Sequence, residues 1–184
     1  MRSGWVAVGY RMGSSVVVPD DAIELAELLG SRQLATAESC TGGLLAQRLA
    51  RAKGSSDWYK GGVVAYQRET KFAVLEVTPG PVVTERAATE MAWGVAKLLD
   101  AEVALAITGA AGPAPQDGAA PGTVVIGLFL DGDANARTYY FAGTPEEVCE
   151  QASDEALHVL RRAFMCPRSD PDDLRRDRGD TRPG

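Results

Sequence analysis

The sequence predicts an α/β domain, a three-layer α/β/α sandwich around a mixed, mostly parallel sheet. Short apolar runs of strand length alternate with segments whose apolar residues recur at helical spacing, a pattern typical of helices packed on a sheet. Two late runs are separated by Asp131-Gly-Asp-Ala-Asn135, whose residues favour a turn and predict an antiparallel hairpin. We therefore expect both parallel and antiparallel strand pairs.

In the first half of the chain, each of two strand-like runs is followed by a helical segment. This order is typical of βα units, in which successive strands lie parallel. The predicted elements are a helix beginning near Asp20, a strand at 34–38, a helix from Leu44, a strand at 61–66 and a helix at 68–76.

The second half contains two helices with recognisable starts. Thr84 can cap the first of them, which carries a long apolar stripe. Thr144-Pro-Glu-Glu147 supplies a capping hydroxyl, a proline at the first helical position and a reciprocal glutamate, so the last helix should begin there and end before Pro167. Between these helices we expect strands at 102–108, 123–130 and 137–141, with a loop of small residues at 109–122.

Length and composition indicate one domain. The chain has 184 residues, 45% of them apolar, which is enough for a single continuous core. We expect a poorly specified segment at 1–19, the α/β domain at 20–166 and a charged tail at 167–184. Arginines and aspartates balance in that tail, a composition that predicts a solvated, disordered segment.

Composition also disfavours several classes of function. The net charge of -6 and the balanced tail argue against direct binding to nucleic acid. No apolar run approaches the roughly 20 residues of a membrane-spanning helix. Cys40, Cys149 and Cys166 lack the spacing of a disulfide framework or a zinc site. We expect a cytoplasmic protein with no membrane partner and no metal.

The segment Ser39-Cys-Thr-Gly-Gly43 lies where a predicted strand end meets a helix N-terminus. Free N–H groups at such a position can hold an anion or an oxyanion, and Ser39 would face that pocket as a nucleophile. Alternatively, Ser39 and Thr41 only cap the helix. Cys40 is a rival nucleophile that we rank below Ser39.

A serine nucleophile needs a base, and the single histidine, His158, falls on the polar face of the last helix. Lys71 follows the second predicted strand, where ligand crevices form in α/β sheets, and is our candidate base. Its pKa would have to fall from about 10.4 to roughly 7 to 8, through burial or through Arg68 or Lys60. The alternative is that Lys71 is an ordinary solvated helix residue.

A third element, Thr108-Gly-Ala-Ala-Gly-Pro113, follows another strand and can form a second pocket wall. The loop lacks the Gly-Lys-Ser/Thr ending of a phosphate-binding P-loop, and the chain has no GxGxxG, so neither ATP nor NAD binding is predicted.

These motifs together resemble the CinA C-terminal domain family. The resemblance spans about Asp20 to Phe164 and rests on segments in matching order, which are Ala37-Glu-Ser-Cys-Thr-Gly-Gly43, Gly54-Ser-Ser56, Gly61-Gly-Val-Val-Ala-Tyr66 with Lys71, Thr108-Gly-Ala-Ala-Gly-Pro113 and Gly122-Thr-Val124. It implies an α/β/α domain that is often oligomeric. It also implies hydrolysis of the amide of nicotinamide mononucleotide to nicotinic acid mononucleotide and ammonia, with no cofactor.

The resemblance also implies roles for individual residues. Ser39 would attack the carboxamide, Lys71 would take its proton and Tyr66 would orient or relay that proton. Contacts to the oxyanion and to the small-molecule nucleotide would come from Thr41, Gly42, Gly43, Thr108, Gly109, Gly112 and Thr123.

The sequence departs from the family at expected substrate contacts. Relatives carry Asp-Arg before the last helix and another arginine a turn later, where this chain has Thr144-Pro145 and Cys149. The long loop ends Ala120-Pro-Gly-Thr123 without the usual lysine, and Gln67-Arg68 replaces Ser-Asn. Two hypotheses follow: an amidohydrolase of this substrate or of an amide with less phosphate, and a non-catalytic ligand-binding or protein-interaction module.

Overall fold

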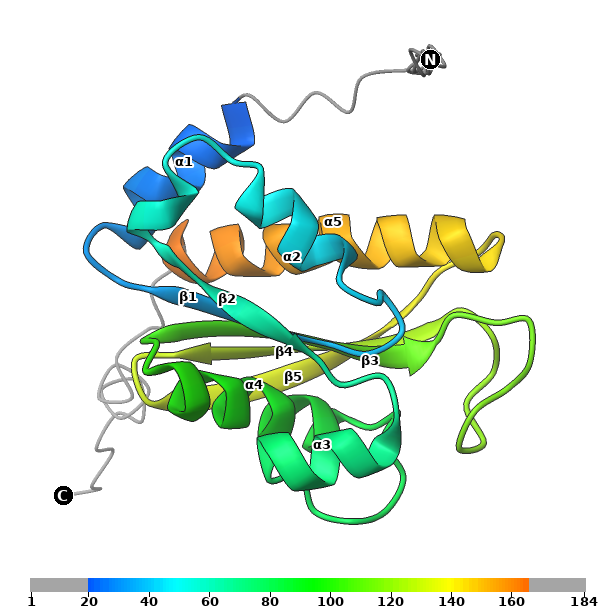
Figure 1. The fold of residues 1–184 in the computed structure, drawn as a ribbon. Helices are drawn as coiled ribbons and strands as arrows, with labels where there is room; N and C mark the ends of the chain where they lie inside the picture. The colour runs from blue at the N-terminus through cyan, green and yellow to red at the C-terminus, as the bar shows by residue number, and fades with distance from the viewer. Residues whose placement is uncertain (1–19, 166–184) are drawn as a thin grey trace, which may run out of the picture.

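The computed structural model describes residues 20–165 as one α/β unit with a five-stranded sheet (Figure 1). The elements in chain order are α1 (Asp20–Leu29), β1 (Leu34–Glu38), α2 (Leu44–Ala50), a 3₁₀ turn η1 (Ser55–Asp57), β2 (Tyr59–Val64), α3 (Arg68–Leu75), α4 (Glu85–Leu99), β3 (Val103–Ala110), β4 (Thr123–Leu130), β5 (Asp133–Tyr140) and α5 (Pro145–Met165).

The sheet is mixed, as expected, and has the order β2-β1-β3-β4-β5. β1 pairs in parallel with β2 on one side and with β3 on the other. β4 is antiparallel to both β3 and β5. The carboxyl ends of β1, β2 and β3 therefore meet at one edge, which is where ligand sites form in open α/β sheets.

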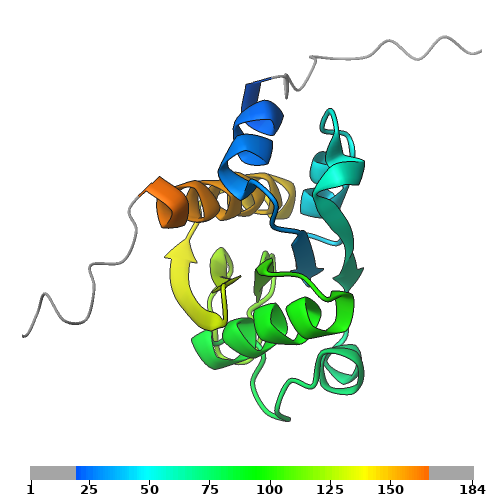
Figure 2. The same ribbon diagram turned by 90° about the vertical axis from the view of Figure 1, so that its left-hand side faces the viewer.

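Helices cover both faces of the sheet, so the predicted three-layer sandwich is confirmed (Figures 1 and 2). α1, α2 and α5 lie on one face and enclose a core that includes Leu45, Leu105 and Leu160. α3 and α4 lie on the other face and enclose a core that includes Leu75 and Met91. These side chains are buried almost completely, and their removal from water drives the packing of both layers.

The two predicted caps are present. The Thr84 hydroxyl accepts a 3.1 Å hydrogen bond from the Ala87 N–H at the start of α4. At α5, the Glu147 N–H donates to the Thr144 hydroxyl at 3.3 Å and the Thr144 N–H donates to the Glu147 carboxylate at 2.7 Å. This reciprocal pair is the capping box that the sequence predicted.

Three strand boundaries differ from expectation. β3 covers Val103–Ala110 rather than 102–108, because Gly109 and Ala110 pair with Val124 and Thr123 of β4 and do not belong to the loop. β2 covers Tyr59–Val64 rather than 61–66, because Ala65 and Tyr66 leave the strand at the candidate site. The hairpin turn needs only Asp131 and Gly132, which have φ of 49° and 97°. Positive φ at both central residues is typical of a two-residue turn between antiparallel strands, so β5 already begins at Asp133.

The predicted segments at 1–19 and 167–184 lie outside the described residues, as does Cys166. Within the described part of the chain, none of the helices combines the length and apolarity needed to cross a membrane.

Candidate active site

The candidate site lies at the carboxyl ends of β1 and β2, where the backbone hydrogen bonds between these two strands stop. The Ala65 N–H donates to the Glu38 carbonyl at 2.8 Å, and on the other side the Ser39 N–H donates to the Ile107 carbonyl at 2.9 Å. Ser39 is therefore held between the ends of β2 and β3. In a parallel ladder, the next bond would run from the Cys40 N–H to the Ala65 carbonyl.

Lys71 of α3 takes the place of that bond. Its Nζ donates to the Ala65 carbonyl at 2.6 Å and to the Tyr66 carbonyl at 3.1 Å. The structure thus brings the predicted base into the gap where the two strands part, beside the Ser39-Cys40 backbone.

The Lys71 side chain has no exposed surface, which contradicts the alternative of a solvated helix residue. Burial lowers its pKa from 10.5 to about 8, and the neighbouring Arg68 acts in the same direction, while Cys40 and Asp117 act in the opposite direction. A neutral amine has two N–H groups and one lone pair. With both N–H groups donated to carbonyls, the lone pair is left to accept a proton.

Ser39 is 4% exposed, and its hydroxyl makes no hydrogen bond within residues 20–165. The Thr41 hydroxyl is also buried without a partner among these residues. The N-cap residue of α2 is Gly43, and it has no side-chain cap bond. The alternative that Ser39 and Thr41 serve as helix caps is therefore wrong.

Glu38 caps α2 instead, a role that sequence reasoning missed. Its carboxylate accepts hydrogen bonds from the N–H groups of Gly43 at 3.1 Å, Leu45 at 3.1 Å and Ala46 at 2.7 Å. The side chain is only 1% exposed. The one signal for this cap in the sequence was a glutamate at the end of a strand, followed by two glycines just before a helix.

The Glu38 cap limits which backbone groups can bind an oxyanion. The Gly43 N–H is taken by Glu38, and the Gly42 N–H donates to the Ser39 carbonyl at 3.0 Å. The N–H groups of Cys40 and Thr41 form no hydrogen bond to an oxygen in the described part of the chain. Both lie against the Cys40 sulfur, where they act to lower the pKa of its thiol. These two N–H groups, rather than those of Gly42 and Gly43, are the ones without an oxygen acceptor.

Cys40 lies next to Ser39 but is poorly suited to be the nucleophile. Burial raises the pKa of its thiol to about 12, and the neighbouring Cys149 adds to that rise. Cys149 of α5 donates its thiol to the Cys40 carbonyl at 3.2 Å, so the second turn of α5 borders the site.

Of the remaining predicted site residues, Tyr66 is exposed, whereas Thr108, Gly109 and Thr123 are packed inside the sheet. Tyr66 binds Lys71 through its backbone carbonyl, while 68% of the residue is exposed. Thr108 is buried with its hydroxyl on the Val82 carbonyl, and a Cβ at Gly109 would lie 2.7 Å from the Thr123 carbonyl oxygen. Thr108, Gly109 and Thr123 are thus packed within β3 and β4.

The long loop at 111–122 extends beyond the carboxyl end of β3 (Figure 1). Gly112, at its start, has a φ of 110°, and a Cβ there would lie 3.9 Å from Pro145, the first residue of α5. The loop and the first turn of α5 therefore form one rim of the site.

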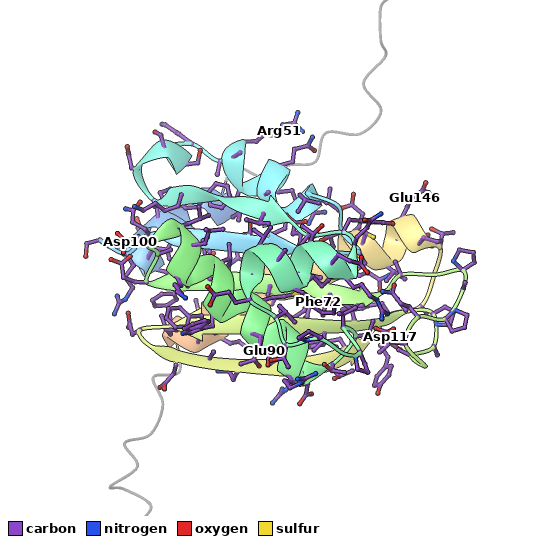
Figure 3. All side chains as sticks on the ribbon, turned by 60° about the horizontal axis from the view of Figure 1, so that its bottom comes forward. Arg51, Phe72, Glu90, Asp100, Asp117 and Glu146 are labelled. Carbon is purple, nitrogen blue, oxygen red and sulfur yellow. The ribbon has the colours of Figure 1, made fainter. Side chains whose placement is uncertain are left out.

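Asp117 fastens this loop to the other side of the site. Its carboxylate accepts from Arg68 at 2.5 Å and from the Val82 N–H at 2.7 Å. Arg68 is the first residue of α3, and Asp117 lies toward that end of the helix (Figure 3). Arg68, suggested by sequence as a helper that lowers the pKa of Lys71, is thus itself paired with a carboxylate.

The residues described above coincide neither with a metal site nor with the cavity at the other end of the sheet. Residues 20–165 contain no group of histidine, cysteine, aspartate and glutamate side chains suited to hold a metal ion. A cavity of about 830 Å³ lies between β4, β5 and the end of α5. It is lined by Leu130, the last residue of β4, and by Asp131, which lie at the opposite end of the sheet from Ser39.

Comparison with known proteins places the chain in a family. The family model described as the CinA C-terminal domain matches residues 22–164. The chain belongs to the CinA C-terminal domain family. That assignment agrees with the resemblance carried by the motifs around Ser39, Lys71 and Thr108.

Relatives of the CinA C-terminal domain include CinA-like proteins of Mycolicibacterium vanbaalenii, 42% identical over 148 residues, and Mycobacterium marinum, 42% identical over 152 residues. These matches cover 77% and 79% of this chain. They cover 35% of each relative, so the chain spans about a third of the length of those proteins.

Solved structures of the same superfamily share the fold. A CinA superfamily protein from Enterobacter cloacae has a TM-score of 0.77 at 31% identity, covering 88% of this chain and 99% of that one. A competence or damage-inducible protein from Enterobacter asburiae has a TM-score of 0.76 at 34% identity, covering 79% of this chain and 96% of that one.

Proposed function

We propose that this CinA C-terminal domain is an amidohydrolase that removes the amide of nicotinamide mononucleotide, or of a related amide with less phosphate, as ammonia. The observation that carries the proposal is the buried Lys71, whose Nζ donates to the Ala65 and Tyr66 carbonyls at the point where β2 parts from the segment that carries Ser39. Serine-lysine catalysis requires a buried amine of lowered pKa and a serine hydroxyl that is free to donate its proton to that amine, and Lys71 and Ser39 are proposed to supply these two groups.

In the proposed reaction, Lys71 takes the proton of the Ser39 hydroxyl as its oxygen attacks the carboxamide carbon. The N–H groups of Cys40 and Thr41 bind the oxygen that becomes negative. The proton held by Lys71 passes to the leaving nitrogen, the C–N bond breaks and ammonia departs. Lys71 then takes a proton from water, which attacks the ester on Ser39. The bond from the acyl carbon to the Ser39 oxygen breaks, Lys71 returns the proton to that oxygen, and the acid product leaves.

Tyr66 has two proposed contributions. Its carbonyl holds the Lys71 amine, and its exposed phenol orients the substrate or relays the proton. Removing the phenol leaves the carbonyl in place, so Tyr66→Phe should reduce the rate without abolishing it.

The test is ammonia release from nicotinamide mononucleotide and from nicotinamide riboside by the purified chain. Ser39→Ala and Lys71→Ala should each abolish release from both. Ser31→Ala and Lys53→Ala are matched controls at exposed positions and should leave the rate unchanged. Full activity in Ser39→Ala would overturn the proposed mechanism.

The second candidate is a non-catalytic binding module. It is favoured by the first turn of α5, where Glu146 and Glu147 lie and where the resemblance would put a phosphate-binding arginine. A folded wild-type protein that releases ammonia from neither substrate would support this module. The predicted cytoplasmic location and homo-oligomer stay predictions.

A further inference from the structure

The Arg68–Asp117 ion pair lies at the start of α3, the helix that carries Lys71. Arg68 opens α3, one turn before Lys71, and its guanidinium binds Asp117 at 2.5 Å. The Arg68 side chain is 45% exposed, whereas the Asp117 side chain is 10% exposed. The cation is therefore more open to solvent than the carboxylate that it binds.

Asp117 lies on an exposed loop, but its carboxylate is held by two partners. Its second oxygen accepts from the Val82 N–H, so one carboxylate joins the long loop, α3 and the segment before α4. The Val82 hydrogen bond, with Arg68 after it, lowers the pKa of Asp117. The group is therefore negatively charged at neutral pH.

Two helix N-termini in the same part of the molecule are also closed by carboxylates. The N-terminus of α2 is closed by the Glu38 carboxylate, and that of α5 is closed by Glu147. A phosphate entering this site would meet these carboxylates and would have to displace Asp117 from Arg68. Charge-assisted bonds of this kind are among the stronger ones in proteins.

We infer that Asp117 sets the substrate class of the Ser39 site by occupying Arg68, so that the site takes a nicotinamide-type carboxamide without phosphate in preference to its phosphorylated form. This inference rests on the proposed amidohydrolase function. It makes Asp117 a specificity-determining residue, acting through Arg68.

The experiment compares kcat/KM for nicotinamide riboside and nicotinamide mononucleotide in the wild type and in Asp117→Asn. The asparagine keeps an oxygen for the Val82 N–H but removes the charge opposite Arg68. The wild type should prefer the riboside. Asp117→Asn should raise the relative kcat/KM of the mononucleotide by about 10-fold, the effect of one freed cation on a phosphate.

Two further variants separate charge from structure. Arg68→Gln in the Asp117→Asn background should cancel the gain on the mononucleotide. Asp100→Asn is the matched control, because Asp100 has a φ of 51° against 52° for Asp117 and lies at the other end of the molecule (Figure 3). It should leave the substrate ratio unchanged.

A pH profile supplies a readout that a purely structural role would not move. Since the Asp117 charge raises the pKa of Lys71, its removal should shift the midpoint of the riboside reaction to lower pH.

The outcomes distinguish the inference from the function. The inference is overturned if the wild type prefers the mononucleotide, or if Asp117→Asn leaves the substrate ratio unchanged in a folded protein. In either case, turnover that depends on Ser39 still supports the proposed amidohydrolase function. No turnover of either amide by the wild type overturns both.

Discussion

The Glu38 carboxylate accepts a 2.7 Å hydrogen bond from the Ala46 N–H, and thereby ties the end of β1 to the first turn of α2. The segment in between carries Ser39, Cys40 and Thr41. Because both of its ends are fixed, by the ladder on one side and by this carboxylate on the other, the Ser39 hydroxyl is positioned by the backbone and needs no hydrogen bond of its own.

Substitution of Glu38 should destabilise the fold. Glu38→Ala leaves the N–H groups of Gly43, Leu45 and Ala46 without their acceptor in a buried region, at an expected cost of about 3 kcal/mol in the free energy of unfolding. Glu38→Gln retains an oxygen but loses the charge at the helix N-terminus, and should cost about 1 kcal/mol. Urea denaturation measures both.

Glu27→Ala, at an exposed position of α1, is the control for the Glu38 substitutions and should change the free energy of unfolding little. Equal stability of Glu38→Ala and the wild type would contradict the capping role.

Activity should rise with pH. The base must be neutral, and with a pKa of about 8 for Lys71 only a minor fraction is neutral at pH 7. The value of kcat should therefore increase about tenfold per pH unit well below the pKa and level off above it. Lys71→Arg, which stays protonated, should be inactive throughout. A kcat that does not change between pH 6 and pH 9 would contradict Lys71 as the base.

Stability should also depend on the protonation of Lys71. The pKa of Lys71 in the folded protein, about 8, lies below its ordinary value of 10.5, so the unfolded chain binds more protons between these values. The free energy of unfolding gained from this residue therefore rises as pH increases from 8 to 10.5. Lys71→Met should show a smaller rise over the same range in denaturant titrations, and an identical rise would contradict the lowered pKa.

Cys40 should be inert at neutral pH. Its thiol has a pKa of about 12, so the thiolate that reacts with iodoacetamide is scarce. Peptide mass spectrometry after alkylation at pH 7.5 should find Cys40 unmodified in the folded protein and modified in urea. Cys40→Ala should keep most of the activity. Loss of activity in Cys40→Ala with unchanged stability would favour Cys40 over Ser39 as the nucleophile.

Features set by neighbouring residues were predictable from sequence. The caps at Thr84 and Thr144 involve residues three positions apart, so their spacing alone revealed them. The strand at Leu34–Glu38 and the helix from Leu44 were confirmed because turn residues separate them. The fold class followed from the alternation of these elements.

The features that sequence reasoning missed depend on tertiary contacts. Arg68 and Asp117 are 49 positions apart, and no local pattern relates them. The Glu38 cap depends on how tightly the loop turns between β1 and α2. Sequence reasoning selected Lys71 by its position after the second strand alone. Its burial could not be predicted, because it results from the packing of α3 beside the end of β2.

The packing of α3 against α4 should control both stability and the position of Lys71. A Cβ at Gly94 of α4 would lie 2.1 Å from the Leu75 carbonyl oxygen at the end of α3, a contact that forces the helices apart. Alanine in place of glycine favours an isolated helix by about 1 kcal/mol, whereas overpacking costs about 1 to 3 kcal/mol. Because the clash is with backbone, we expect Gly94→Ala to lower the thermal midpoint and to reduce kcat by displacing Lys71.

The control is Leu98→Ala, at a residue of the same helix that is 51% exposed, and it should change neither the thermal midpoint nor kcat. A higher thermal midpoint in Gly94→Ala would show that the two helices need not approach so closely.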